Sequence, residues 1–153
     1  MNEKKTETEL PDWITSHIQL YREDPDKGHM WDSTAVGGPG LLPTLLLQTT
    51  GRKSGRASVL PLIYKKMGND FVIIASKGGA PTHPAWYLNL LADPDCEIQV
   101  AHDHFRVKAR TEEGDERESL WQQLAEIYPP YKDYQAATTR KIPVVVLEPR
   151  AWA

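Results

Sequence analysis

The feature that most constrains the fold of this chain is a series of short strand-like runs, separated mainly by turn residues rather than by helices. Clusters of glycine and polar residues, such as Gly51–Gly55 and Gly68–Asp70, stand between runs rich in apolar and β-branched residues. We expect strands over Pro43–Thr50, Ala57–Lys65, Phe71–Ser76, Cys96–Ala101, His104–Arg110 and Ile142–Leu147. Because helices do not follow these strands at regular intervals, the pattern disfavours a parallel nucleotide-binding sheet. It predicts an α+β barrel that is mostly antiparallel.

Helical periodicity predicts peripheral helices at three places. Apolar residues recur at helical spacing from about Asp12 to Arg22 and again over His83–Ala92. The acidic cluster Glu112–Glu116 begins a third amphipathic helix, since acidic side chains suit the positive end of a helix dipole. Pro129 and Pro130 end that helix.

The length of 153 residues suits one domain with an N-terminal appendage. We expect residues 1–40 to hold a disordered tail over Met1–Glu9, the first helix, and an irregular connection over Asp24–Gly40, and residues 41–153 to form the barrel. The first ten residues are charged and polar, unlike a signal peptide, and no apolar run approaches the ~20 residues that cross a bilayer. The sequence therefore predicts a cytoplasmic protein.

Charge is distributed unevenly along the chain. The net charge is −3, yet the segment from Ser33 to Ala92 holds six basic residues and one acidic residue, so it carries +5 and leaves −8 for the rest. Such a chain is poorly suited to bind nucleic acid and better suited to bind a small anionic ligand. The alternative is that these cations are only solvated side chains of turns and strand edges.

Two glycine-rich segments are candidates to hold an anionic ligand. Gly51–Gly55 offers two cations, a hydroxyl and backbone amides, and Ser76–Gly79 ends a strand where a ligand can approach the backbone closely. A basic hairpin turn would have the same composition as the first segment, so that alternative stays open. Trp86 and the tyrosines of the segment Tyr128–Tyr134 provide aromatic surface, either for a flat ring or for ordinary packing.

The sequence lacks the residues that other kinds of chemistry require. It has no G-x-S-x-G elbow, no H-E-x-x-H motif and no close Cys/His pair. Its one cysteine, Cys96, cannot form an internal disulfide, and its five histidines lack zinc-ligand spacing, so we expect no metal site. Any catalysis must therefore come from a cofactor.

Several segments, in a fixed order, carry a resemblance to a known family. They are Leu45–Gly55 (LLLQTTGRKSG), Ala75–Ala80 (ASKGGA), Pro84–Leu90 (PAWYLNL) and Tyr128–Gln135 (YPPYKDYQ), followed by Ile142–Val145 (IPVV). From about Leu41 to Pro149, the chain resembles the deazaflavin-dependent nitroreductase family of the flavin/deazaflavin oxidoreductase superfamily. The resemblance implies a split β-barrel of the flavin-reductase, FMN-binding type. It also implies that the chain binds coenzyme F420, an 8-hydroxy-5-deazaflavin, and passes its hydride to a quinone-like or nitroaromatic acceptor.

The resemblance further implies roles for individual residues. The residues expected to bind the coenzyme are Arg52, Lys53, Ser54, Arg56, Ser76, Lys77, Gly78, Gly79, Trp86, Tyr87 and Asn89. Residues 52–54 would face the phosphate and tail, and residues 76–79 the deazaflavin and its ribityl chain. The residues expected to border the acceptor and act in catalysis are Ser76, Tyr128, Tyr131 and Tyr134. The sequence departs from the family at Ala57-Ser58, where relatives carry Pro-Arg, and Arg56 is the candidate to supply the missing charge.

Two alternatives and two further questions stay open. The alternatives are an FMN-dependent oxidoreductase of the same fold and a noncatalytic barrel that carries a ligand such as the coenzyme, haem or a fatty acid. FMN has no oligoglutamate tail, so it leaves the spread of cations through Lys65, Lys66 and Lys77 unexplained. The N-terminal helix is also a candidate for contact with a membrane that holds a lipid quinone, and the sequence does not predict the oligomeric state.

Overall fold

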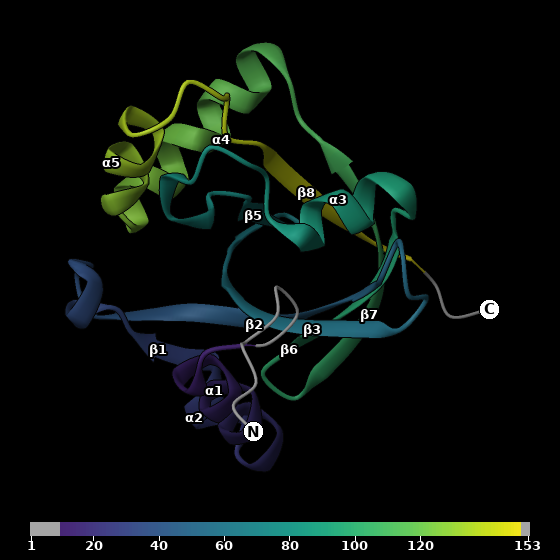
Figure 1. Cartoon of the computed structure of the whole chain (residues 1–153). Coiled ribbons are helices and arrows are strands. Elements are labelled where there is room, and N and C mark those ends of the chain that lie inside the picture. Colours follow the sequence, from purple (N-terminus) through teal and green to yellow (C-terminus); the bar gives the residue numbers. More distant parts are fainter. Residues whose placement is uncertain (1–9, 151–153) are drawn as a thin grey trace, which may run out of the picture.

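An antiparallel sheet of eight strands curls around a core, with helices on its outside (Figure 1). The computed structural model describes residues 10–150, so the expected disorder of Met1–Glu9 lies outside the described residues. The strands are β1 Met30–Asp32, β2 Leu41–Thr50, β3 Ala57–Ile63, β4 Lys65–Met67, β5 Asp70–Ile74, β6 Asp95–Val100, β7 Asp103–Thr111 and β8 Val144–Arg150. The helices are α1 Asp12–Glu23, α2 Pro25–His29, α3 Ala85–Ala92, α4 Gly114–Ile127 and α5 Pro130–Ala136, with 3-10 turns η1 Thr34–Val36 and η2 Lys77–Gly79.

The sheet does not close into a full barrel. Its strands follow the order β1-β2-β6-β7-β8-β5-β4, and β3 also pairs with β2. The expected single strand Ala57–Lys65 is two strands, because β3 pairs with β2 whereas β4, which follows Tyr64, pairs with β5. Among the described residues, β3 and β4 each pair with one neighbour only. The prediction of a mostly antiparallel α+β split β-barrel with peripheral helices is confirmed.

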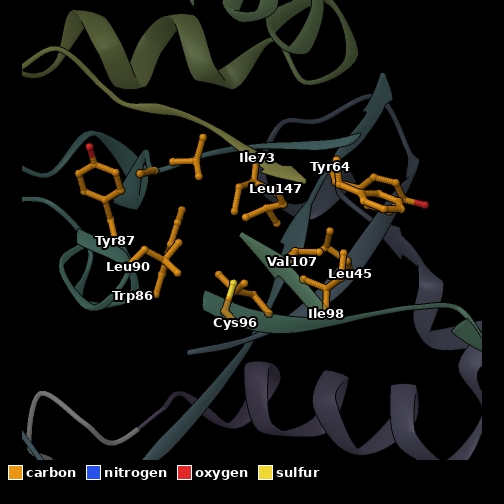
Figure 2. Packing of buried hydrophobic residues seen from close by; sticks show 14 residues of the cluster. Leu45, Tyr64, Ile73, Trp86, Tyr87, Leu90, Cys96, Ile98, Val107 and Leu147 are labelled. Carbon is orange, nitrogen blue, oxygen red and sulfur yellow. The ribbon is translucent and has the colours of Figure 1, made fainter. Parts of the chain in front are cut away.

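Strand β5 lies between two hydrophobic clusters. Phe71 and Ile73 pack in the barrel interior, and Val72 and Ile74 pack on the opposite face against α4. Figure 2 shows the interior cluster, with side chains of α3 at one end and Tyr64 at the other. Full burial of an aliphatic or phenyl side chain stabilises a fold by about 1.5–3 kcal/mol. Strand β5 is therefore buried on both faces.

The predicted helices form, with small changes at their ends. Helix α1 extends one residue beyond the expected Arg22, and α3 begins at Ala85 because Pro84 has an extended conformation with ψ of 151°. Helix α4 ends before the two prolines, as expected. Pro130 then begins α5, a helix that the sequence did not predict, where the missing N–H of a first-turn proline has no cost.

Three loop and strand boundaries differ from the expectations. The connection Asp24–Gly40 is more regular than predicted, since it holds α2, β1 and η1. The turn expected at His102-Asp103 lies one residue earlier, because Ala101 has a positive φ of 53° and Asp103 already pairs in β7. Strand β8 continues to Arg150, because pairing with β7 extends past the apolar run.

Helix α1 is attached to the outer face of β2. Ile18 and Tyr21 pack there against Leu46. The Tyr21 hydroxyl donates to the Thr44 carbonyl and accepts from the Ala101 amide, both at 2.8 Å, and burial raises its pKa to about 12. The helix therefore packs against the barrel, and the division at residue 40 stays a prediction. Between residues 10 and 150, no helix has the length and apolar character that crossing a bilayer requires.

Candidate functional site

A cavity of about 910 Å³ lies beside the open edge of β3. Leu60–Ile63 of β3 line one side, Ser76–Gly78 and the start of α3 line a second, and tyrosines around α5 line a third. Trp13 and Trp31 line the far end. In Figure 1, α4 and α5 lie on one side of the molecule and the β2–β3 hairpin on the other. Ligand pockets measure ~300–1,000 Å³ and are mostly apolar, so this cavity has room for more than one flat ring system.

Arg52 stands at one end of the cavity because Asn89 of α3 holds it there. The Asn89 Oδ1 accepts hydrogen bonds from the backbone amide and from Nη1 of Arg52, both at 3.1 Å. The Asn89 Nδ2 donates to Thr49 Oγ1 at 3.1 Å. Asn89 is 5% exposed, and an unpaired amide in such a place costs about 1–3 kcal/mol. This network therefore fixes the start of the turn that follows β2.

The rest of the basic turn lies outside the cavity. Lys53 and Arg56 are exposed beyond Arg52. The Ser54 hydroxyl accepts a hydrogen bond from the Arg56 amide at 3.1 Å, so it belongs to the bonding of the turn itself. Of the predicted turn residues, the structure thus brings only Arg52 to the cavity wall.

The remaining basic residues of the positively charged segment from Ser33 to Ala92 lie in two places. Lys77 lines the cavity, next to Ser76. Lys65 and Lys66 lie on β4 and are not among the lining residues. The interpretation that all these cations serve one ligand is therefore not supported by their positions.

The loop Ser76–Gly79 presents backbone to the cavity. Lys77, Gly78 and Gly79 have φ angles of 47°, 62° and 83°, in the left-handed region that glycine adopts readily. A Cβ at Gly78 would meet no atom within 4 Å, whereas a Cβ at Gly79 would lie 2.6 Å from the carbonyl oxygen of Tyr134. Glycine at position 78 is therefore favoured only by the left-handed backbone. Glycine at position 79 is favoured by the backbone and also permits the close approach of α5.

Gly79→Ala is expected to destabilise the fold by roughly 2–4 kcal/mol, because it combines a left-handed alanine with a collision against α5. Gly78→Ala is the matched control, since it has the left-handed backbone without the collision and should cost about 1–2 kcal/mol. Urea denaturation of both variants measures the difference. Equal losses would contradict the inferred contact with α5.

Helix α3 places one aromatic ring on the cavity wall and a second ring behind it. Trp86 lines the cavity. Tyr87 does not, because its hydroxyl is hydrogen-bonded with Thr111 Oγ1 at 2.8 Å. The Tyr87 ring lies edge-on to the rings of Trp86 and His83. Tyr87 therefore supports the wall rather than facing a ligand.

Three tyrosines from the end of α4 and from α5 gather at the cavity, as the sequence predicted. The ring centroids of Tyr128, Tyr131 and Tyr134 lie 4.8–6.2 Å apart. The Tyr128 and Tyr134 hydroxyls share a hydrogen bond of 2.9 Å. Burial raises the pKa values of Tyr128 and Tyr131 far above the usual range, so both hydroxyls stay protonated.

Within residues 10–150, the hydroxyls of Tyr131 and Ser76 are unpaired, unlike the hydroxyls of Tyr128 and Tyr134. Neither has a hydrogen-bond partner in the part of the chain that the structure describes, although both residues line the cavity. No fully buried side-chain oxygen in that part lacks a partner, so the Tyr131 hydroxyl is accessible to solvent, and Tyr131 is a residue of the cavity wall. These two hydroxyls are therefore free to donate a hydrogen bond.

Sequence reasoning missed several residues of the site. His83 lines the cavity, and Trp13 stacks on Trp31 at its far end with ring centroids 6.2 Å apart. Arg140 donates hydrogen bonds to backbone carbonyls of the segment Ala75–Ala80 from behind. A single histidine or arginine in a polar stretch has no pattern that marks it, whereas the helical spacing around Trp13 gave a partial signal.

Comparison with known proteins identifies the family. The profile of the F420H(2)-dependent quinone reductase family matches residues 20–149. The chain belongs to this family. It is 44% identical over 145 residues to an F420H(2)-dependent quinone reductase of Mycobacterium tuberculosis strain H37Rv, and the match covers 90% of this chain and 97% of that protein. The family resemblance inferred from the sequence motifs is confirmed.

Solved structures agree with this membership of the F420H(2)-dependent quinone reductase family. An F420-H2 dependent reductase, FDR-A, is 42% identical with a TM-score of 0.65, over 69% of this chain and 94% of that one. The heme storage protein HutZ from Vibrio cholerae is 19% identical with a TM-score of 0.52, over 71% of this chain and 82% of that one. The second likeness shows a shared fold alone.

Proposed function

We propose that this chain is an oxidoreductase that transfers a hydride from reduced coenzyme F420 to a quinone. The observation that carries the proposal is that one cavity collects side chains from all of Leu45–Gly55, Ala75–Ala80, Pro84–Leu90 and Tyr128–Gln135. These segments are far apart in the chain, and the fold brings residues of each to the same cavity. The relatives named F420H(2)-dependent quinone reductases support the same assignment.

The residues at the cavity fit this coenzyme. Coenzyme F420 joins a flat ring to a ribityl chain, a phosphodiester and an oligoglutamate tail, so it needs an apolar slot that ends in cations. Trp86 and the tyrosines form the slot, and Arg52 stands at its end. Lys53 and Arg56 continue the positive charge outward on the exposed turn, where a flexible tail can reach them. The loop Ser76–Gly79 allows close approach of the ribityl chain.

Three of the residues expected to bind the coenzyme serve it indirectly. Asn89 holds Arg52, Tyr87 supports the wall behind Trp86, and the Ser54 hydroxyl stabilises the basic turn. We assign these three a supporting role in binding. Their replacement should act through the position of their neighbours.

The chain's own residues provide position and proton donors. When bound, the reduced coenzyme supplies the hydride from C5 of its ring. The walls around Trp86 hold two flat molecules together and exclude water, which favours transfer between them. As negative charge develops on an acceptor oxygen, the free Tyr131 hydroxyl donates to it, and Ser76 is the second candidate donor. The Tyr128–Tyr134 pair completes the wall around them.

The far end of the cavity favours an apolar acceptor. Leu10, Ile14, Trp13 and Trp31 line it, together with His17, whose Nε2 is hydrogen-bonded with the Gly28 carbonyl oxygen at 2.8 Å. Within residues 10–150, no carboxylate, lysine or arginine side chain lines this end. A quinone with an apolar side chain can pack there at little cost, whereas a charged acceptor would lose hydration without gaining a partner. An apolar nitroaromatic compound meets the same requirement and is the second acceptor class of the proposal.

The protein is expected to accelerate the oxidation of reduced coenzyme F420 by menadione well above the rate without protein. Stopped-flow absorbance of the deazaflavin measures both rates. The background should be low, because the deazaflavin favours two-electron transfer and reacts slowly with oxygen. Equal rates with and without protein, together with tight binding, would favour the alternative of a ligand carrier.

Reduced FMN is the matched control for the cofactor. It should bind weakly and support little turnover, because it has no oligoglutamate tail to contact Lys53 and Arg56. Tight FMN binding with turnover, and none with the deazaflavin, would overturn the cofactor assignment and leave the fold unchanged.

We also propose that α1 contacts a membrane surface. Trp13 and Leu20, which are seven residues apart and hence on one face of the helix, are 57% and 42% exposed. Val36 and Leu41 are also exposed, at 47% and 64%. Trp13 lines the apolar end of the cavity, so a quinone held in a bilayer could enter there without crossing water.

The double variant Trp13→Ala/Leu20→Ala is expected to reduce sedimentation with vesicles of phosphatidylglycerol and phosphatidylcholine by tenfold or more. Each apolar side chain gains about 1.5–3 kcal/mol on leaving water. Leu91→Ala is the control, since Leu91 is 60% exposed on α3, away from this face. Unchanged binding of the double variant would contradict the membrane proposal.

A further inference from the structure

His83 occupies a place at the cavity that none of the sequence motifs explains. It lies between the Ser76–Gly79 loop and α3 and lines the same cavity as Lys77 and Trp86. Its Nδ1 lies 3.0 Å from Nη1 of Arg140. Its ring is edge-on to Tyr87, with centroids 5.0 Å apart. The ring is therefore held on two sides.

The contact with Arg140 determines which nitrogen of His83 carries the proton. A guanidinium group has only donors, so the imidazole Nδ1 must accept this hydrogen bond with its lone pair. The ring is then neutral, and its single N–H is at Nε2. Burial and the nearby positive charge of Arg140 both lower the pKa of His83, which agrees with a neutral ring. Within residues 10–150, Nε2 has no hydrogen-bond partner.

Arg140 is itself fixed by the loop that it supports. Its guanidinium donates to the carbonyl oxygens of Ala75 at 3.3 Å, Ser76 at 2.7 Å and Ala80 at 2.8 Å. These carbonyls precede and follow the left-handed residues of the loop. One side chain thus holds both the loop and the histidine ring in a single arrangement.

We propose that the His83 Nε2–H is a hydrogen-bond donor to the ring system of bound coenzyme F420, and that Arg140 is the positioning residue that keeps the donor in this tautomer. The proposal rests on the coenzyme assignment of the proposed function. It adds a binding residue and a positioning residue to that site.

The position of His83 favours the coenzyme over the acceptor as its partner. His83 belongs to the wall that also contains the loop residues Lys77 and Gly78, whereas the apolar end of the cavity is formed by α1 and β1 residues. The free Tyr131 hydroxyl already provides a donor for the acceptor. A heterocycle with ring carbonyls or ring nitrogens offers the acceptor atom that a neutral N–H needs.

Two substitutions of His83 test the roles of its two ring nitrogens separately. His83→Asn places an amide oxygen near the position of Nδ1, so it keeps an acceptor for Arg140 and removes the donor toward the ligand. His83→Gln reaches as far as Nε2 and keeps a donor there. We expect His83→Asn to raise the dissociation constant of oxidised coenzyme F420 by about two- to tenfold in fluorescence titration, and His83→Gln to restore most of the affinity.

Nitrogen-15 NMR of the histidine rings at pH 7.5 tests the tautomer without using activity. The His83 signals, assigned by their loss in His83→Asn, should show a neutral ring with the proton on Nε2, and the Nε2–H signal should shift when the coenzyme binds. In Arg140→Lys, a single ammonium group cannot reach the loop carbonyls and the ring together. The Nδ1–H tautomer should then become populated and the coenzyme affinity should fall.

The outcomes distinguish this inference from the function on which it rests. If the unmodified protein does not bind the coenzyme, both proposals fail. If it binds and His83→Asn binds equally well, the coenzyme assignment stands and the donor role of His83 is wrong. An unchanged His83 tautomer in Arg140→Lys would overturn the positioning role of Arg140.

Discussion

Tyr131→Phe is expected to slow the chemical step of quinone reduction by about 10²–10⁴-fold and to leave the dissociation constant of coenzyme F420 unchanged. The substitution keeps the ring, which is packed in the cluster around α4, and removes only the hydroxyl. That hydroxyl has no hydrogen-bond partner in the described chain and is accessible to solvent, and Tyr131 lines the cavity. Its loss should therefore affect the acceptor more than the fold.

The protonation state of Tyr131 explains why we assign the donor role to it. Burial raises its pKa far above the usual range, so the hydroxyl is protonated at neutral pH and can donate. A hydrogen bond to an oxygen that gains negative charge strengthens in the transition state. The effect should therefore appear in kcat rather than in the binding of either ligand.

Tyr134→Phe is the matched control, because it removes a hydroxyl of the same wall that is already bonded to Tyr128. We expect a smaller loss of rate, since the Tyr128 hydroxyl stays in place. Single-turnover stopped-flow with saturating coenzyme measures the step directly. Wild-type rates in both Phe variants would move the donor role to Ser76 or to water.

The sequence predicts those parts of the fold that local chemistry controls. Strand β5 is apolar at successive residues, and its burial on both faces follows from that pattern. The end of α4 follows from Pro129 and Pro130. The division of Ala57–Lys65 into β3 and β4 could not be predicted in this way, because the two parts are nearly continuous in sequence and differ only in their pairing: β3 pairs with the preceding strand β2, and β4 with the following strand β5.

For the candidate site, the motifs predict which segments meet but not what each side chain does there. Arg52 and Trp86 line the cavity, as expected. Tyr87 follows Trp86 in the sequence, yet its hydroxyl is bonded to Thr111, 24 residues away. His83 and Arg140 are 57 residues apart, so no local pattern links them. The roles of such residues depend on tertiary neighbours, which one sequence does not reveal.

Arg52→Ala combined with Lys53→Ala is expected to raise the dissociation constant of coenzyme F420 at least tenfold. A hydrogen bond to a charged group contributes about 1.5–3 kcal/mol to binding. Because both side chains are exposed, we expect each contribution to lie at the lower end of this range. Fluorescence titration with the oxidised coenzyme measures the change. The loss should be larger at low salt, where surface charges are screened less.

The chain offers a control that removes the same charge elsewhere. Lys65→Ala combined with Lys66→Ala also removes two positive charges from the +5 segment, but these lysines lie on β4 and do not line the cavity. If the net charge of the segment attracts the coenzyme, the two double variants should weaken binding equally. If Arg52, held by Asn89 at the cavity end, contacts the phosphodiester, the first variant should lose much more affinity than the second. Unchanged affinity in the first variant would contradict the proposed orientation of the coenzyme. Equal losses in both variants would show that long-range attraction, rather than a contact with Arg52, provides the affinity.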